Sequence, residues 1–309
     1  MRMGEDNQEG AEDILANCFV MLLGISVVLT GLAIALREPM LMFFGASAQT
    51  FPYANDYLTI YVLGTVFAIL TAGLNQFITC QGFANEAMLT TVIGAVMNII
   101  LDPIFIFVFG LGVKGAAIAT VLSQACSCAF VLWFLFGDRV HVRITFRGYS
   151  WKVMRRVLSF GFCPFIIIAG DSVLIIALNT VLQNYGGAQG DMLIACATIV
   201  QSYMQIVTLP LGGISSGTQP ILSFNYGAKN SDRIRQGEKE IVKLSLLFCL
   251  TMFIISQTVS GVFVRLFTQN PEYVQLSVWA IRVFTFGIIP LALQYAFVDG
   301  LTALGILKV

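Results

Sequence analysis

One short stretch of the chain combines a carboxamide, a carboxylate and a proline inside an otherwise apolar run. Asn98 and Asp102 are four residues apart, so on a helix they share one face. Pro103 follows at once, and because proline has no backbone N–H, the carbonyl of Ile99 loses its helical partner. Oxygen atoms of these kinds suit a hard cation, and a carboxylate in apolar surroundings can instead carry a proton. The alternative is a kink whose acid is satisfied by Asn98 and a neighbouring helix.

A second acid lies in the later half of the chain. Asp171 follows Pro164 by seven residues in a span that carries no other charge, so we expect it to be buried and to contact an ion or a substrate. The alternative is a structural acid that is hydrogen-bonded to an amide such as Gln201. Gln201 and Gln205 share one helix face, and polar residues at this spacing either hold helices together or line a cavity.

Other motifs give weaker signals. Asp299, beyond Pro290, is either a further site acid or a solvated acid at a helix end. All seven cysteines lie in apolar runs, where they act as small hydrophobic residues rather than metal ligands. Residues 213–217 match the G-x-S-x-G pattern of hydrolases, but a helix rather than a strand precedes them. We therefore predict no enzyme, no metal site and no cofactor other than a coupling ion.

The composition places these residues in a membrane. Hydrophobic residues make up 57% of the chain and charged residues 11%, with a mean hydropathy of +0.84, whereas soluble domains are about 25% charged. Continuous apolar runs of about 20 residues predict membrane-spanning helices rather than strands. We expect eight spans, at 15–36, 53–74, 87–110, 116–136, 161–182, 192–213, 241–265 and 274–305.

The basic residues alternate from loop to loop. Six lie within 139–156 and four within 229–239, and Arg2 and Lys308 lie near the two ends. An even number of spans puts both ends on one side, and the positive-inside rule makes that side cytoplasmic. Topology explains these charges, so no nucleic-acid partner is expected. The loops between them carry few basic residues, namely Arg37, Lys114 and Arg265.

The chain nearly repeats itself at an offset of 223 residues. Gly4 aligns with Gly227 and Gly64 with Gly287, and hydrophobic blocks match between them. Two copies of one module indicate two lobes related by pseudo-symmetry. A 223-residue unit fits 309 residues incompletely, so we expect two helices to be missing at each end. The predicted fold is an all-α polytopic membrane protein with eight of an expected twelve helices, in two six-helix lobes.

Three regions follow from this repeat. Residues 1–136 form a first-lobe remnant and residues 161–309 a second-lobe remnant. Between them, residues 137–160 form a cytoplasmic linker. In its second half, Trp151, Met154 and Leu158 fall on one face of a predicted amphipathic helix that would lie on the inner leaflet.

Two blocks resemble the multidrug and toxic compound extrusion (MATE) transporters. The stretch GAVMNIILDPIFIFVFGLGVKGAAIAT at 94–120 is similar to the fifth-to-sixth helix region of that family. The stretch TLPLGGISSGTQPILSFNYGAKN at 208–230 is similar to its eighth helix and following loop. The resemblance covers essentially the whole chain. It implies a two-lobed antiporter of bacterial type.

The resemblance also implies site residues. Asn98 and Asp102 match the cation site of the family's first lobe, Thr120 matches a threonine of its sixth helix, and Asn75 matches a polar residue of its fourth helix. Asp171 lies ten residues after Gly161, as an acid does in some branches, but the local pattern Gly-Phe-Cys-Pro departs from theirs. The family's first-helix acid would fall before residue 1. Kinks are expected at prolines of four helices, namely Pro103, Pro164, Pro210 and Pro290.

The predicted function is export of amphipathic or cationic drugs or toxic compounds. Transport would proceed by alternating access and would be driven by inward H⁺ or Na⁺. The alternatives are a lipid-linked precursor flippase of the same superfamily and a non-functional membrane remnant of a truncated gene. We expect a multi-pass protein of the bacterial plasma membrane, monomeric when complete, whose partners are its small-molecule substrate and the lipid bilayer.

Overall fold

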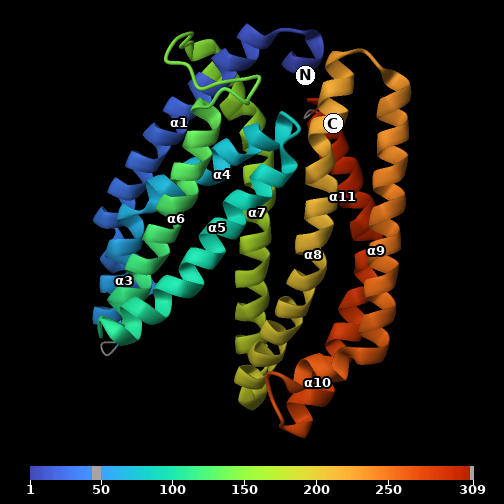
Figure 1. Ribbon diagram of the computed structural model, residues 1–309. Coiled ribbons are helices and arrows are strands. Elements are labelled where there is room, and N and C mark those ends of the chain that lie inside the picture. The colour runs from blue at the N-terminus through green and yellow to red at the C-terminus, as the bar shows by residue number, and fades with distance from the viewer. Residues whose placement is uncertain (44–49, 307–309) are drawn as a thin grey trace. The chain divides into compact units, whose positions relative to one another are not determined.

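A computed structural model describes residues 1–43 and 50–306, and every regular element among them is a helix (Figure 1). Lys308, counted above among the basic residues, lies outside the described residues. The chain divides into two compact units. We call residues 6–157 the N-terminal unit, to which Arg2 also belongs. Residues 158–306, with Met1 and Met3–Glu5, form the C-terminal unit.

The N-terminal unit is a helical bundle arranged around α6. Its small buried residues, among them Ala117 and Ala119, let neighbouring helices approach closely, and α3, α4 and α5 all pack on it. The elements are α1 (Gln8–Ala35), α2 (Arg37–Phe43), α3 (Phe51–Leu63), α4 (Thr65–Cys80), α5 (Ala84–Pro103), the π-helical turn η2 (Ile104–Val108) and α6 (Gly112–Phe136). The short turn η1 (Arg2–Glu5) precedes them, and most of its residues belong to the C-terminal unit.

The C-terminal unit packs α8, α9, α10 and α11 around a shared apolar core. Val207, Leu211, Ile281 and Ile288 are fully buried there. No helix of the described residues packs extensively along α7. The elements are α7 (Trp151–Tyr185), η3 (Gly187–Gln189), α8 (Gly190–Gly227), α9 (Ser231–Arg265), α10 (Pro271–Phe284), η4 (Thr285–Gly287) and α11 (Ile288–Ala303).

The helices confirm the predicted spans. In the described part of the chain, seven helical segments are long and apolar enough to cross a membrane, and the pair α3 and α4, bent by 48°, makes an eighth if it is one span. The predicted span 274–305 is interrupted by the short 3-10 turn η4. Gly287 lies in this turn and Pro290 follows it. Because Pro290 has no N–H, it cannot continue the regular ladder across this point.

The two units repeat their backbone geometry at the predicted offset. Asn7 caps α1 by accepting from the N–H of Gly10, and Asn230 caps α9 by accepting from the N–H of Arg233. The residues just before these caps, Asp6 and Lys229, both have positive φ angles, of 54° and 56°. Gly82 after α4 and Gly305 after α11 also share positive φ. These pairs are all 223 residues apart, so the repeat extends to individual helix ends.

Both units also break the same helix at the same place and repair the break similarly. The break between α3 and α4 falls at Gly64, and Thr30 of α1 donates its hydroxyl hydrogen to the Val62 carbonyl at 3.2 Å. In the other unit, Gln257 of α9 donates to the Arg282 carbonyl at 3.1 Å beside η4. A side chain of the preceding long helix thus satisfies a backbone carbonyl near each break.

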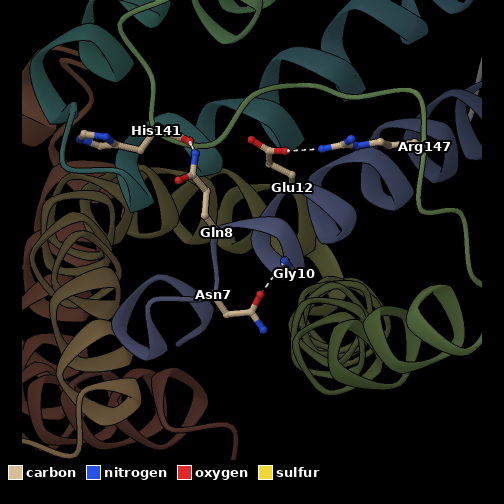
Figure 2. A network of polar contacts seen from close by, with 6 residues as sticks. All are labelled: Asn7, Gln8, Gly10, Glu12, His141 and Arg147. Atoms are coloured by element: carbon tan, nitrogen blue, oxygen red, sulfur yellow. Dashed lines mark hydrogen bonds and ion pairs between the residues drawn. The ribbon is translucent and has the colours of Figure 1, made fainter.

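The first part of the predicted linker packs on helices of the N-terminal unit. Gln81 exchanges two hydrogen bonds with the backbone of Val142. Asn17, fully buried, donates to the Gly148 carbonyl and accepts from the Ser150 N–H, both at 2.9 Å. Figure 2 shows further ties to α1, in which Gln8 donates to the His141 carbonyl and Arg147 pairs with Glu12. The charged composition of 137–150 did not reveal these contacts.

Three helices, α7, α8 and α9, extend ten or more residues beyond their predicted limits. The expected interfacial helix at 151–158 is continuous with the next span, and together they form α7. This helix also continues through Pro164 without a break. Helix α8 continues past its predicted end to Gly227. In this added part, the hydroxyls of Ser216 and Thr218 donate to carbonyls of their own helix. The basic residues of 231–239 lie on the first turns of α9, not in a loop, because Asn230 caps the helix at that point.

We predict that Asn17→Ala destabilises the protein. The change removes the hydrogen bonds to the Gly148 carbonyl and from the Ser150 N–H, at a net cost of about 0.5–1.5 kcal/mol for each bond. Thermal unfolding in detergent should therefore show a clearly lowered midpoint. Asn85→Ala, at an exposed position of α5, is the matched control and should leave the midpoint nearly unchanged. Equal midpoints for the two variants would contradict the interpretation that Asn17 holds residues 148–150 against α1.

Candidate functional site

Asn98, Asp102 and Thr120 come together where α5 packs against α6. The Asn98 amide donates to Asp102 Oδ1 at 3.3 Å and to Thr120 Oγ1 at 3.5 Å. The Thr120 hydroxyl donates in turn to the Ala116 carbonyl at 2.9 Å, so its oxygen is left to accept from Asn98. All three site side chains are half-buried. A carboxylate, a hydroxyl and a carboxamide therefore share one small region inside a membrane-spanning bundle.

The backbone beside this cluster is irregular. Pro103 ends α5, and the chain continues as the π-helical turn η2. Such turns interrupt regular helices and occur frequently at functional sites. The N-terminal turn of α6 closely approaches η2, since a β-carbon at Gly115 would lie 2.6 Å from the Phe105 carbonyl oxygen. This close approach helps to fix α6, and hence Thr120, against the end of α5.

Asn75 is not part of the cluster. Its amide donates to the Ala87 carbonyl at 3.1 Å, near the start of α5. Ala87 lies eleven residues before Asn98, or about 16 Å along a helix that rises about 1.5 Å per residue. The structure thus separates Asn75 from Asp102, because α4 meets α5 at the opposite end of α5.

Gln124 is a residue that the sequence did not single out. It lies one turn after Thr120 on the same face of α6, and its Oε1 is buried without a hydrogen-bond partner among the described residues. Such an acceptor costs free energy unless something else satisfies it. A single glutamine in an apolar helix forms no periodic pattern of polar residues. The one signal that could have identified Gln124 is its i, i+4 spacing from Thr120.

A second polar cluster lies in the C-terminal unit. The Ser215 hydroxyl, almost fully buried on α8, donates to Asp299 Oδ2 on α11. Tyr295 lies one turn before Asp299, within electrostatic range of both Asp299 and Asp171. Asp299 is therefore a half-buried acid with a hydroxyl partner, rather than a solvated acid at a helix end. Ser215 and Asp299 are 84 residues apart, so the sequence could not pair them.

The remaining candidates are less buried than the sequence suggested. Asp171 is exposed, in contrast to its predicted burial, because no helix of the described residues covers α7. Gln201 is half-buried and Gln205 is exposed on α8. The structure shows no side-chain hydrogen bond from either glutamine to a neighbouring helix among the described residues. The predicted pairing of Asp171 with Gln201 is likewise not seen.

The four prolines differ in their effects. Pro103 closes α5, and Pro290 lies in the first turn of α11 directly after η4. Both therefore coincide with interruptions of a spanning segment. Pro164 and Pro210 lie inside α7 and α8, which continue as single helices through them. The two interruptions that coincide with a proline thus fall next to Asp102 and in the segment that carries Asp299.

Comparison with known proteins gives consistent matches along the chain. The family model described as MatE matches residues 1–104 and 167–309. The chain is 28% identical over 307 residues to a multidrug export protein MepA of Staphylococcus haemolyticus, and 27% identical over 309 residues to one of Staphylococcus aureus. Each match covers 96% of this chain and 66% of the relative. The chain thus spans slightly less than two thirds of the length of these curated relatives.

Solved structures share the fold. An outward-facing multidrug resistance MATE family transporter superimposes with a TM-score of 0.92 at 24% identity, over 99% of this chain and 68% of that one. A MOP superfamily transporter from Pyrococcus furiosus superimposes with a TM-score of 0.90 at 24% identity, over the same shares. The two-lobed helical architecture and the matching family model agree, and the family consists of transporters rather than enzymes. The chain therefore belongs to the MatE family of membrane transporters.

Proposed function

We propose that the protein exports amphipathic or cationic compounds in exchange for H⁺ or Na⁺. The single observation that carries this proposal is the cluster of Asp102, Asn98 and Thr120 inside a membrane-spanning bundle. An intramembrane carboxylate costs about 2.5–3.5 kcal/mol on insertion scales, so it marks a functional site by default. The staphylococcal relatives are multidrug export proteins by name, which supports drug-like substrates.

Asp102 would be the coupling group. When it is ionised, its charge attracts a proton or Na⁺ from water. When it is neutralised, its hydrogen bond from Asn98 weakens, because bonds to a charged acceptor are roughly twice as strong as bonds to a neutral one. The adjacent π-helical turn and Pro103 allow the end of α5 to respond. Cation binding would thus shift α5 against α6 and bias the protein between inward-open and outward-open states.

The oxygen set is compatible with either ion. Asp102 and Thr120 supply a carboxylate and a hydroxyl oxygen, and Asn98 supplies a carboxamide oxygen if its amide turns. Hard cations prefer such ligands. A proton requires only Asp102. We propose alternating access with both chain ends on the cytoplasmic side, in accordance with the distribution of basic residues.

The sign of the interior charges favours cationic over anionic substrates. Each polar cluster contains a carboxylate, Asp102 in one and Asp299 in the other. A lipid-linked precursor carries phosphate and would require basic side chains at these places. In the C-terminal unit, Asp171, Asp299 and the Tyr295 ring would attract the cationic part of a substrate by charge and by cation–π contact. Gln201 and Gln205 remain proposed contacts on α8.

Asp102→Asn should abolish cation-driven efflux of a fluorescent lipophilic cation from proteoliposomes. The amide keeps the size of the side chain but neither ionises nor takes up a proton, so we expect at least about a tenfold loss, the effect of about 1.4 kcal/mol. Imposing the pH gradient and the Na⁺ gradient separately identifies the ion. The matched control is Asp138→Asn, an exposed acid that pairs with Arg143 at 2.9 Å. Native efflux by the Asp102 variant would refute the coupling role.

Asp299→Asn should raise the half-saturating concentration of a cationic substrate by about tenfold and leave that of a neutral amphipathic substrate nearly unchanged. The reason is that removing one charge near the ligand costs roughly 1–2 kcal/mol at an intermediate dielectric constant. Ser215→Ala tests whether the hydroxyl positions the carboxylate, and it should give a smaller shift of the same kind. Equal effects on the cationic and the neutral substrate would show that Asp299 is structural.

A further inference from the structure

The first turns of α9 project beyond the apolar part of their membrane span. Helix α9 has 35 residues, or about 52 Å at about 1.5 Å per residue, whereas the hydrocarbon core of a bilayer is about 30 Å thick. Charged residues crowd positions 232–243, and none follows until Arg265. The start of α9 therefore lies at the level of the lipid headgroups, on whichever side of the membrane it faces.

A groove opens at this level between α9, α8 and α11. Its volume is about 320 Å³, at the lower end of the range of about 300–1,000 Å³ for small-molecule sites. Arg235 and Lys239 of α9 line it, four residues apart on one face, and Leu222 of α8 is buried at its wall. Phe297 and Leu301 of α11 form an outer apolar wall and are 52% and 38% exposed.

The two basic groups of the groove have no acidic partner within 4.0 Å among the described residues. Among the described residues that line the groove, the one acid is Glu238. It turns towards α11, where a β-carbon at Gly300 would lie 2.7 Å from its Oε2. The missing side chain of Gly300 thus gives the Glu238 carboxylate a place away from Arg235 and Lys239. With one acid against two bases, the lining keeps a net charge of +1.

We propose that this groove binds an anionic phospholipid. Its phosphate would lie between the Arg235 guanidinium and the Lys239 ammonium, which donate charge-assisted hydrogen bonds. An acyl chain would run along Phe297 and Leu301, which already face outwards. Basic pockets between membrane helices at the interface are suited to acidic headgroups. A free phosphate ion would contact only the basic side of the groove, so the apolar wall would not contribute to its binding.

The test is lipid-dependent thermal unfolding of the purified chain in mixed micelles. Phosphatidylglycerol should raise the unfolding midpoint more than phosphatidylcholine, because a ligand that binds only the folded state stabilises it. In Arg235→Gln/Lys239→Gln, the half-saturating phosphatidylglycerol concentration should rise about 25-fold, since each basic residue contributes about a fivefold factor. Phe297→Gln should also raise it, through the loss of the apolar wall.

The matched control is Arg233→Gln/Lys243→Gln, which removes two charges from the same helix. Arg233 lines a different groove, between α8 and α9, and Lys243 pairs with Glu240 at 3.9 Å. This control should keep the native phosphatidylglycerol dependence. An equal loss in both double variants would show general attraction to a basic surface and overturn the site.

Two further results would also overturn the proposal. The first is a native phosphatidylglycerol response in Arg235→Gln/Lys239→Gln. The second is equal stabilisation by glycerol 3-phosphate alone, which would assign the groove to a soluble phosphate compound. If the double variant does not fold, each single substitution should still shift the half-saturating lipid concentration by about fivefold, and no shift in either would contradict the proposal.

Discussion

Inside a lipid bilayer, every backbone N–H and C=O must find a partner within the protein, and the rest of this structure depends on that constraint. It permits a helix to break only where neighbouring groups repair the break. Thr30 and Gln257 provide such repairs at equivalent places in the two units. The end of α5 is different, since Pro103 removes a donor and the chain enters a π-helical turn beside Asp102. Irregular backbone and an ionisable side chain thus occur together at the candidate coupling site.

Much of the fold follows from the sequence because membrane helices depend mainly on local composition. The eight spans and the 223-residue repeat are visible in the apolar runs, and the structure extends the repeat to the caps at Asn7 and Asn230. Helix ends were harder to predict, because polar residues can continue a helix that is properly capped. Helix α9 therefore begins ten residues before its apolar run, and α8 continues through a serine-rich stretch.

The candidate site could likewise be predicted from the sequence only in part. Asn98 and Asp102 could be found from spacing alone, because an i, i+4 pair needs no knowledge of tertiary structure. Tertiary contacts could not be found in this way. The Ser215–Asp299 pair, the orphan oxygen of Gln124 and the separation of Asn75 from Asp102 all depend on which helices pack together. The exposure of Asp171 likewise reflects the lack of a covering helix along α7 in the described residues.

The central claim is that Asp102 takes up the coupling cation, and infrared difference spectroscopy tests it most directly. A change of pH or of Na⁺ concentration should produce a carboxyl band that is present in the native protein and in Asp138→Asn. The same band should be missing in Asp102→Asn. A band that persists unchanged in Asp102→Asn would contradict the account and would place the coupling group elsewhere.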